Sequence, residues 1–464
     1  MKVSIKNLGI LHQADFEVKD LTIICGANNT GKTYATYALY GFLAMQKNRL
    51  GTELICNEKL HDLSRKGIVK ILCGSFNEVI NEFLKYTCEW FVEYLPNAFG
   101  THESAFIKAY FDVDINISEA IAKEHTLTVT DLRNVPRFEL TKLSGESFLS
   151  IKLVSALSAD EIEAEWPILV LNEAISVFLG SILFAVPYIA STARADAATF
   201  QKELDISRNR IIEYISTQNR NINSLGLFES LHDRRYSWPV KQNVDFVRDL
   251  ENIAKTKSYI DKKHQDIIDL FTVLAGGTYK ATKEGVYFVP KKSGKSQLTM
   301  GESASSVRSL LYIGMFIKHI AQPGHLLMID EPELNLHPTN QRMMARLIAK
   351  LVNSGIRVFI TTHSDYILRE FNTLIMMHNL GTAANFYMQK HKYVKNELLD
   401  PNKIKAYIAK EMLVETDSNK KKTKRNVIVQ AEIGSQGIEI EEFDTTINIM
   451  NKVQDDLLFS GGII

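Results

Sequence analysis

The feature that most constrains the fold of this chain is a glycine-rich loop at residues 26–33, with the sequence GANNTGKT. An apolar run at residues 21–25 predicts a buried strand before the loop. Residues from Lys32 to about Met45 form an apolar pattern that predicts a helix packed on a sheet after it. The pattern GxxxxGK[ST] between a strand and a helix surrounds nucleotide phosphates with backbone N–H groups. We therefore expect an ATP site here.

Two side chains of this loop have specific roles in the prediction. Lys32 reaches the outer phosphates, and the hydroxyl of Thr33 holds Mg²⁺. The other candidate nucleotide-binding residues of the segment are Gly26, Asn28, Asn29, Thr30, Gly31 and Tyr34. A glycine turn without a ligand is the alternative, and the flanking strand and helix argue against it.

An apolar strand at residues 325–329 ends in the acidic pair Asp330 and Glu331. Burying two carboxylates at a strand end is costly unless a cation or a reaction uses them. We expect Asp330 to hold Mg²⁺ through water, and Glu331 to orient or deprotonate the water that attacks ATP. An ordinary strand end with acidic helix-capping residues is the alternative.

Small hydroxyl and glycine residues at 298–306, with the sequence LTMGESASS, precede an apolar helix predicted at 307–320. Such residues at a helix N-terminus make an anion cradle. Because this cradle lies elsewhere on the surface that carries the loop, it can serve only a nucleotide held by a second copy. Plain helix capping is the alternative. The candidate residues of this signature block are Gly301, Ser303, Ser305 and Ser306.

A further buried strand, predicted at residues 358–362, is followed by His363. We expect this strand to lie next to the acidic strand and parallel to it, so that His363 points at the same γ-phosphate. A lone histidine is more often a satisfied core or surface residue, and the position after the acidic strand favours the catalytic interpretation. Asn335, in the loop at 332–338, is predicted to face the partner copy and to relay occupancy between the two sites.

Four blocks, in this order, resemble ABC-type ATPases of the branch that contains the OLD, RecF and SMC proteins. They are GANNTGKT at 26–33, LTMGESASS at 298–306, MIDEPELNLHP at 328–338 and ITTHSDYIL at 360–368. The resemblance implies an α/β fold: a P-loop ATPase head with a mixed sheet, a helix-rich insertion between P-loop and signature, and a small α+β C-terminal tail. The expected boundaries are 1–50 for the N-terminal lobe, 51–185 for the insertion, 186–380 for the rest of the head, and 381–464 for the C-terminal extension.

The form DEPELNLHP followed by TTHSDY is similar to the compact OLD-like ATPases of bacterial anti-phage systems, such as the ATPase subunits of PARIS and Septu. This resemblance implies an ATP-hydrolysing switch that forms an ATP-linked homodimer, or a higher homo-oligomer. The switch would respond to a phage-encoded trigger protein and control a separate toxic effector, a nuclease. The tail sequence VIVQAEIGSQGIEIEEF lacks the glutamate and spaced Asp pair of an OLD nuclease site, so the chain itself is not expected to cut nucleic acid.

Two other classes of protein remain as alternatives. A RecF-like DNA-repair ATPase acting directly on DNA would use the basic run at residues 420–425, for which a solvated loop is the other interpretation. A transporter ATPase carries a short helical subdomain where this chain has a long insertion, which argues against that class.

Charge and cysteine content bear on location and partners. Lys plus Arg and Asp plus Glu each number 54, so the chain has no global attraction to nucleic acid or to a membrane. The four cysteines show no CxxC spacing, which fits a reducing cytoplasm. The apolar stretch at 167–190 carries Asn172 and Glu173 and predicts a buried helix running into a core strand. We expect a cytoplasmic protein without a membrane partner.

Periodicity predicts the remaining elements. A long helix is expected at 243–274 and a hairpin at 279–290. In the tail we expect a strand at 374–377, a helix after Pro401, and strands near 427–433 and 438–441. A final helix is predicted from apolar residues at helical spacing: Phe443, Ile447, Met450, Val453 and Leu457.

Overall fold

The computed structural model describes residues 1–46, 57–122, 124–130, 135–158, 160–161, 164, 166–200, 236–291, 296–415, 422–439 and 449–457. The chain divides into two compact units. The first unit comprises Met1–Ser4, Ala38–Leu95 and Tyr110–Pro187, and the second comprises Ile5–Tyr37, Pro96–Ala109 and Tyr188–Ile464.

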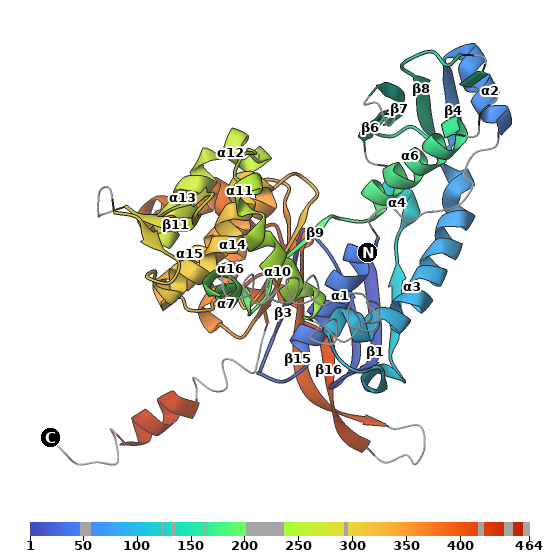
Figure 1. Ribbon diagram of the computed structural model, residues 1–464. Coiled ribbons are helices and arrows are strands. Elements are labelled where there is room, and N and C mark those ends of the chain that lie inside the picture. Colours follow the sequence, from blue (N-terminus) through green and yellow to red (C-terminus); the bar gives the residue numbers. More distant parts are fainter. Residues whose placement is uncertain are drawn as a thin grey trace, which may run out of the picture. The chain divides into compact units, whose positions relative to one another are not determined.

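A mixed nine-stranded sheet forms the centre of the fold (Figure 1). Its strand order is β5 (Tyr110–Asp114), β1 (Lys2–Leu8), β2 (Leu11–Glu17), β16 (Lys422–Gln430), β15 (Ile404–Glu415), β3 (Leu21–Gly26), β14 (Arg357–Thr362), β13 (Leu326–Asp330) and β9 (Pro187–Ala190). Strands β3, β14 and β13 are parallel neighbours. Every residue of β3 and β13 is buried, as expected for parallel strands covered on both faces. The predicted α/β fold with a mixed sheet is confirmed, and so is the parallel pairing of the two motif-bearing strands β13 and β14.

Four helices of this fold follow the motif-bearing segments: α1 (Lys32–Met45), α14 (Ser305–His319), α15 (Pro338–Asn353) and α16 (Asp365–Leu380). Helix α15 begins at a proline in its first turn, where the missing N–H costs nothing. Helix α16 begins after Ser364, whose hydroxyl accepts a hydrogen bond from the N–H of Ile367. Phe316 of α14, Leu347 of α15 and Phe371 of α16 are fully buried in the hydrophobic core of the second unit. The residues at the start of α15 and α16 set where these helices begin. The buried side chains set which face of each helix packs on the core.

The remaining elements of the second unit are shorter. They are α7 (Arg194–Thr199), α10 (Trp238–Arg248), α11 (Leu250–Ile253), α12 (Tyr259–Lys263), α13 (Gln265–Ala275), α17 (Ala384–His391), β10 (Gly277–Thr282), β11 (Gly285–Pro290), β12 (Leu298–Thr299), β17 (Ile433–Gly434), β18 (Gly437–Ile438), and the 3-10 turns η2 (Glu103–Phe106), η3 (Gly381–Ala383), η4 (Lys395–Glu397) and η5 (Pro401–Lys403). The predicted hairpin is confirmed as β10 and β11. The single long helix predicted at 243–274 is wrong, because the chain breaks into separate helices there. Ser258 leaves helical geometry and caps α12, and His264, with a φ of −134°, breaks the path between α12 and α13.

The first unit contains a four-stranded antiparallel sheet, with order β4 (Ile68–Leu72), β8 (Phe148–Leu153), β7 (Pro136–Lys142) and β6 (His125–Thr130). Its helices are α2 (Asn57–Lys66), α4 (Ile117–Ile121), α6 (Trp166–Leu183) and most of α3 (Asn77–Phe99), with the turn η1 (Cys73–Phe76). Most of this unit falls in the segment expected to be a helix-rich insertion, and its helices hold more residues than the four strands of its sheet. The predicted boundaries of the insertion stay a prediction.

Helix α6 is, among the described helices, the one that is long and apolar enough to cross a membrane by length and composition alone. Its mean hydropathy is 1.7, and 44% of its residues are buried inside the protein. The buried residues include Leu171, Ile175 and Phe178, and the ring of Phe178 packs on His125 of β6. Core helices of soluble proteins pass the same test. The predicted order of a helix running into a core strand is confirmed, since β9 follows α6.

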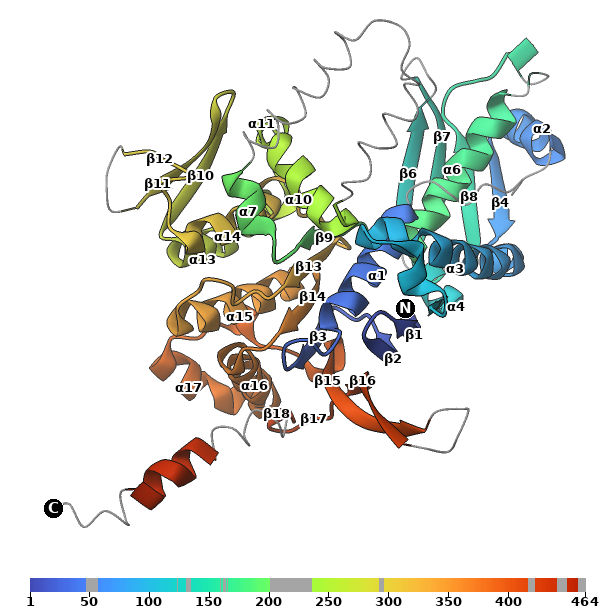
Figure 2. The same ribbon diagram turned by 60° about the horizontal axis from the view of Figure 1, so that its bottom comes forward.

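The tail differs most from expectation. The segment predicted as a strand at 374–377 lies inside α16, and the segment predicted as a helix after Pro401 is the long strand β15. Strand β15 pairs with β3 on one side and β16 on the other, so the expected C-terminal extension supplies two strands of the central sheet (Figure 2). A helix does occur at 449–457, whereas Phe443 and Ile447 lie outside the described residues.

Candidate nucleotide site

The loop between β3 and α1 has the conformation of an anion-binding turn. Gly26 has a φ of 140° and Gly31 a φ of 96°, and Asn29 also has a positive φ, of 62°. A Cβ added at Gly26 would lie 2.2 Å from the carbonyl oxygen of Ala409 on β15, so only glycine fits there. Such reversals of handedness form a concave nest of N–H groups. The loop therefore fits nucleotide phosphates.

The polar side chains of the loop divide into exposed and internal ones. Asn28 and Asn29 are exposed, together with Ala27. Thr30 is buried, and its hydroxyl donates to the carbonyl oxygen of Ala27 at 2.8 Å. Thr30 therefore stabilises the loop, and a phosphate would meet its backbone N–H rather than its hydroxyl.

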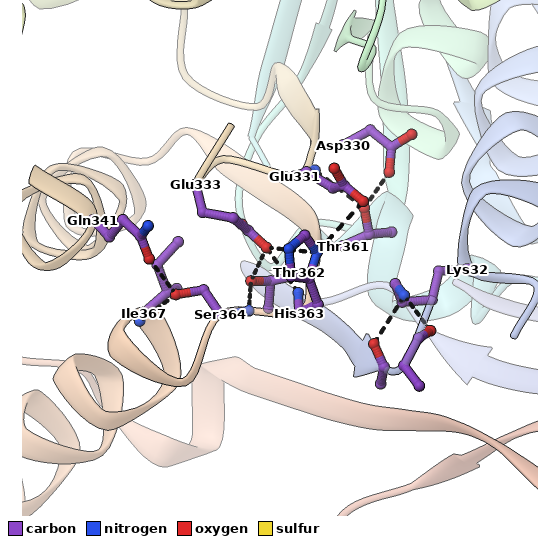
Figure 3. A network of polar contacts seen from close by, with 12 residues as sticks. Lys32, Asp330, Glu331, Glu333, Gln341, Thr361, Thr362, His363, Ser364 and Ile367 are labelled. Carbon is purple, nitrogen blue, oxygen red and sulfur yellow. Dashed lines mark hydrogen bonds and ion pairs between the residues drawn. The ribbon is translucent and has the colours of Figure 1, made fainter. Parts of the chain in front are cut away.

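Lys32 spans the loop from its first helical position (Figure 3). Its Nζ donates to the carbonyl oxygens of Gly26 at 2.9 Å and Ala27 at 2.7 Å. Burial lowers the pKa of Lys32, and the nearby carboxylates, Glu331 first and then Asp330, act against that shift. A buried ammonium held by carbonyl dipoles is available to move onto a phosphate, which is a stronger acceptor.

Asp330, at the end of β13, is buried between two hydroxyl groups. Thr33 Oγ1 donates to Asp330 Oδ2 at 3.4 Å, and the hydroxyl of Thr361 on β14 donates to Oδ1. Burial raises the pKa of Asp330, and the hydrogen bond from Thr361 opposes the shift. A divalent cation would offset the same desolvation. No group of three or more His, Cys, Asp or Glu side chains within the described residues is placed to hold a metal. A magnesium ion would therefore use Thr33, Asp330, water and phosphate oxygens.

Glu331, His363 and Glu333 form a second cluster at the same edge of the sheet (Figure 3). His363 Nδ1 lies 3.5 Å from Glu331 Oε1 and 3.3 Å from Glu333 Oε1. Glu331 adopts a φ of 55°, uncommon outside glycine, and its N–H donates to the carbonyl oxygen of Thr361 at 3.1 Å. The turn at Glu331 thus directs the carboxylate toward His363, and the predicted pairing of these residues in one site matches the geometry.

Glu333 is a participant that the sequence did not single out. It is 6% exposed, and its Oε1 accepts hydrogen bonds from the hydroxyl of Thr362 at 2.8 Å and from the N–H of His363 at 2.7 Å. Burial raises the pKa of Glu333. Ser364 extends the network, because its hydroxyl donates to Gln341 Oε1 at 2.6 Å. The backbone and the ring of His363 are therefore both held by Glu333.

Arg194 is the second participant that was missed. It follows β9 and is 2% exposed. Its guanidinium donates to the carbonyl oxygens of Ser191 at 2.9 Å, Asp330 at 2.7 Å and Glu331 at 2.7 Å, and Nε donates to Ser309 of α14 at 3.0 Å. Burial lowers the pKa of Arg194 to about 10, with the carboxylates of Asp330, Glu333 and Glu331 opposing the shift. One buried cation thus joins the signature helix to the acidic turn. The only sequence signal was an arginine among small residues directly after a strand.

The serines of the signature block differ in their exposure to solvent. Ser303 is 4% exposed, and its hydroxyl donates to the carbonyl oxygen of Thr299 at 2.7 Å. Ser305 and Gly301 are exposed, and Ser306 is half-buried at the second helical position. Ala304 occupies the N-cap and provides no side-chain hydrogen bond, so the first N–H groups of α14 are not capped by a side chain of that position. Ser305 and Ser306 are better placed than Ser303 to meet a ligand.

Asn335 and Tyr34 occupy different settings. Asn335 is exposed with a φ of 60°, on the turn between the acidic strand and α15. The ring of Tyr34 stacks on Phe99 at a centroid distance of 5.4 Å, and a Cβ added at Gly9 would lie 2.1 Å from this ring. The ring of Tyr34 is thus used in packing, and its backbone N–H is the group it can offer to a phosphate.

Comparison with known proteins identifies the class that this fold and site define. The family described as "AAA ATPase domain" matches residues 1–368. The chain belongs to this family and is a P-loop ATPase. A comparison with curated proteins finds no match.

Among solved structures, the chain is similar to three SMC head domains. One is the SMC head bound to the C-winged helix domain of ScpA, with 11% identity, a TM-score of 0.31, and coverage of 92% of this chain and 97% of that one. The second is the Smc head domain with an extended coiled coil bound to the C-terminal domain of ScpA from Pyrococcus furiosus, with 12% identity, a TM-score of 0.30 and 98% coverage of both chains. The third is the SMC head domain from Thermotoga maritima, with 12% identity, a TM-score of 0.28 and coverage of 93% and 98%.

Proposed function

We propose that two copies of this chain enclose two ATP·Mg²⁺ between the P-loop of one copy and the signature block of the other. The observation that carries the proposal is the exposure of Gly301 and Ser305 at the start of α14. The hydrogen bonds described for residues 298–306 lie within that segment, with β11, and with Arg308 and Ser309 of α14. None of those described reaches Lys32, Asp330, Glu331 or His363, which lie together around the end of β13 (Figure 3). An uncapped helix start with small hydroxyl residues binds an anion, and a second copy would supply it.

In each proposed site, the residues have separate roles. Lys32 and the loop N–H groups hold the phosphates, and Thr33 with Asp330 hold Mg²⁺, which supplies charge neutralisation on the phosphate oxygens when bound. Glu331 orients and deprotonates the attacking water, and His363, positioned by Glu333, contacts the γ-phosphate side of the site. Asn335 faces the partner copy. Hydrolysis removes the γ-phosphate that both copies contact, so the pair loosens.

We further infer that this switch acts in the cytoplasm as the sensor and scaffold ATPase of an anti-phage complex, and that it restrains or releases a separate nuclease. Support comes from the sequence DEPELNLHP followed by TTHSDY, and from the tail. Strands β15 and β16 belong to the central sheet, so the described tail residues up to 439 serve mainly the ATPase fold itself. A phage-encoded protein would be the trigger.

The test is purification of tagged Glu331→Gln protein, expressed from its native operon, with ATP and Mg²⁺, followed by mass measurement of the intact complexes. We expect a second polypeptide with nuclease or toxin features to co-purify in a fixed ratio. The matched control is Lys32→Met, which should lose any partner that depends on bound ATP. A chain that comes out alone and binds DNA only with ATP would contradict the defence role and favour direct action on DNA, through residues such as the exposed Lys422, Lys424 and Arg425 of β16.

A further inference from the structure

An apolar groove lies among α15, α16 and α17, on the second unit and outside the nucleotide site. It has a volume of about 660 Å³. Met376, Met377 and Leu380 of α16 form one side, and Tyr387 of α17 lies against them. Met376 is 44% exposed and Leu380 is 50% exposed. Neighbouring large apolar side chains at this exposure mark a surface that another apolar group can cover.

The C-terminal helix at 449–457 has an apolar stripe of matching size. All nine residues are exposed, and the apolar ones are Ile449, Met450, Val453 and Leu457. At about 100° per residue these four fall within an arc of about 100°, the width of a helix face that packs on a core. An isolated helix of this length is marginal in water, because its few hydrogen bonds do not offset the cost of nucleation. A stable helix here therefore needs a surface to cover its stripe.

The chain between the two features is long enough to bring them together. The hairpin of β17 and β18 is fixed to α16, because Asn372 Oδ1 accepts from the N–H of Ile438 at 2.8 Å and Nδ2 donates to its carbonyl oxygen at 3.1 Å. Asn372 is adjacent in sequence to Thr373, a residue of the groove. Ten residue steps separate residue 439 from Ile449 and can span up to about 35 Å. The groove is within that reach.

The helix at 449–457 and the groove also match in length and in charge. Nine helical residues extend about 13 Å, close to the length of α16 from Thr373 to Leu380. Asp456 borders the apolar stripe, and Arg342 and His391 border the groove. The guanidinium of Arg342 already pairs with Glu370 at 2.7 Å, so the imidazole of His391 is the group beside which this carboxylate would favour one orientation of the helix over its reverse.

We propose that residues 449–457 of each chain dock as a helix in the groove of the same chain, with Val453 and Leu457 against Met376 and Leu380. The contact lies beyond the proposed ATP switch and does not depend on it. It closes the groove to other proteins for as long as the helix is bound.

The test is a disulfide between paired cysteines in the full chain, Met376→Cys with Val453→Cys, formed with a mild oxidant. Both positions are exposed, whereas Cys25, Cys73 and Cys88 of the natural sequence are buried. The fourth cysteine, Cys56, lies outside the described residues and is replaced by serine in every variant. We expect a bond that joins the two peptides and leaves the protein a monomer on a non-reducing gel. The matched control is Met376→Cys with Asp455→Cys, because Asp455 lies on the opposite face of the helix and should not cross-link. Covalent dimers, equal cross-linking of the control pair, or no cross-link would each overturn the proposal.

Hydrogen exchange provides a second readout that does not depend on cysteine. We expect amides of 449–457 in the natural chain to exchange about tenfold more slowly than in Val453→Asp, since docking by about 1.4 kcal/mol gives that ratio. Equal exchange in the two proteins would overturn the proposal.

Discussion

Glu331→Gln is expected to lower ATP turnover by about 10²–10⁴-fold while leaving ATP binding intact. Glutamine keeps the shape of the side chain but cannot accept the proton of the attacking water. The P-loop, Lys32 and Asp330 keep their contacts, because the bonds that hold the turn at residue 331 come from its backbone. Phosphate release measures turnover, and fluorescence of a labelled nucleotide measures binding.

The control for this substitution is Glu82→Gln, an exposed glutamate of α3 in the first unit. Its turnover should equal that of the natural chain. We also expect ATP to convert Glu331→Gln protein into a stable dimer, because the γ-phosphate that joins the copies is no longer removed. Turnover of Glu331→Gln at the natural rate would show that another group activates the water.

Arg194→Met is expected to lower the free energy of unfolding of the second unit by about 3–5 kcal/mol. The substitution leaves the carbonyl oxygens of Asp330 and Glu331 without their buried donor, and each unpaired group costs about 1–3 kcal/mol. Urea denaturation followed by circular dichroism measures the effect. We expect turnover per folded molecule to fall as well, since the acidic turn loses its link to α14.

Two further variants serve as comparisons for Arg194→Met. Arg194→Lys keeps the charge but cannot reach carbonyls of three elements at once, so its loss should be intermediate. Arg369→Met removes an arginine that is 54% exposed and pairs with Asp365 on the same helix. Its effect should stay below about 1 kcal/mol. Equal losses for Arg194→Met and Arg369→Met would contradict the role assigned to Arg194.

The sequence predicts the parts of the fold whose pattern is local. The glycine spacing at 26–31 and the apolar runs before Lys32, Glu331 and His363 are such patterns, and the structure has a strand at each. The bonds of Arg194 are not local, because its carbonyl partners lie as many as 137 positions away in sequence. Glu333 likewise meets Thr362 only after β13 and β14 pair. Such contacts leave no periodic signal.

The errors in the tail have a different cause. Strand β15 contains Ala, Lys, Glu, Met and Leu, residues that favour helices in isolation, and pairing with β3 and β16 outweighs this preference. The apolar run at 374–377 fits a strand or a buried helix equally by periodicity. The N-cap at Ser364 and the length of α16 favour the helix over the strand.

The most direct test of the shared site is to mix two inactive variants. Lys32→Met disables the P-loop, and Ser305→Asp places a negative charge where the partner's γ-phosphate would bind while keeping a residue that suits a helix start. In a mixed pair, one site combines the intact P-loop of one chain with the intact signature of the other. Each variant alone should be inactive, and an equal mixture should recover about a quarter of the natural turnover, because half the pairs are mixed and each holds one intact site of two. A mixture no more active than its components would contradict the shared site.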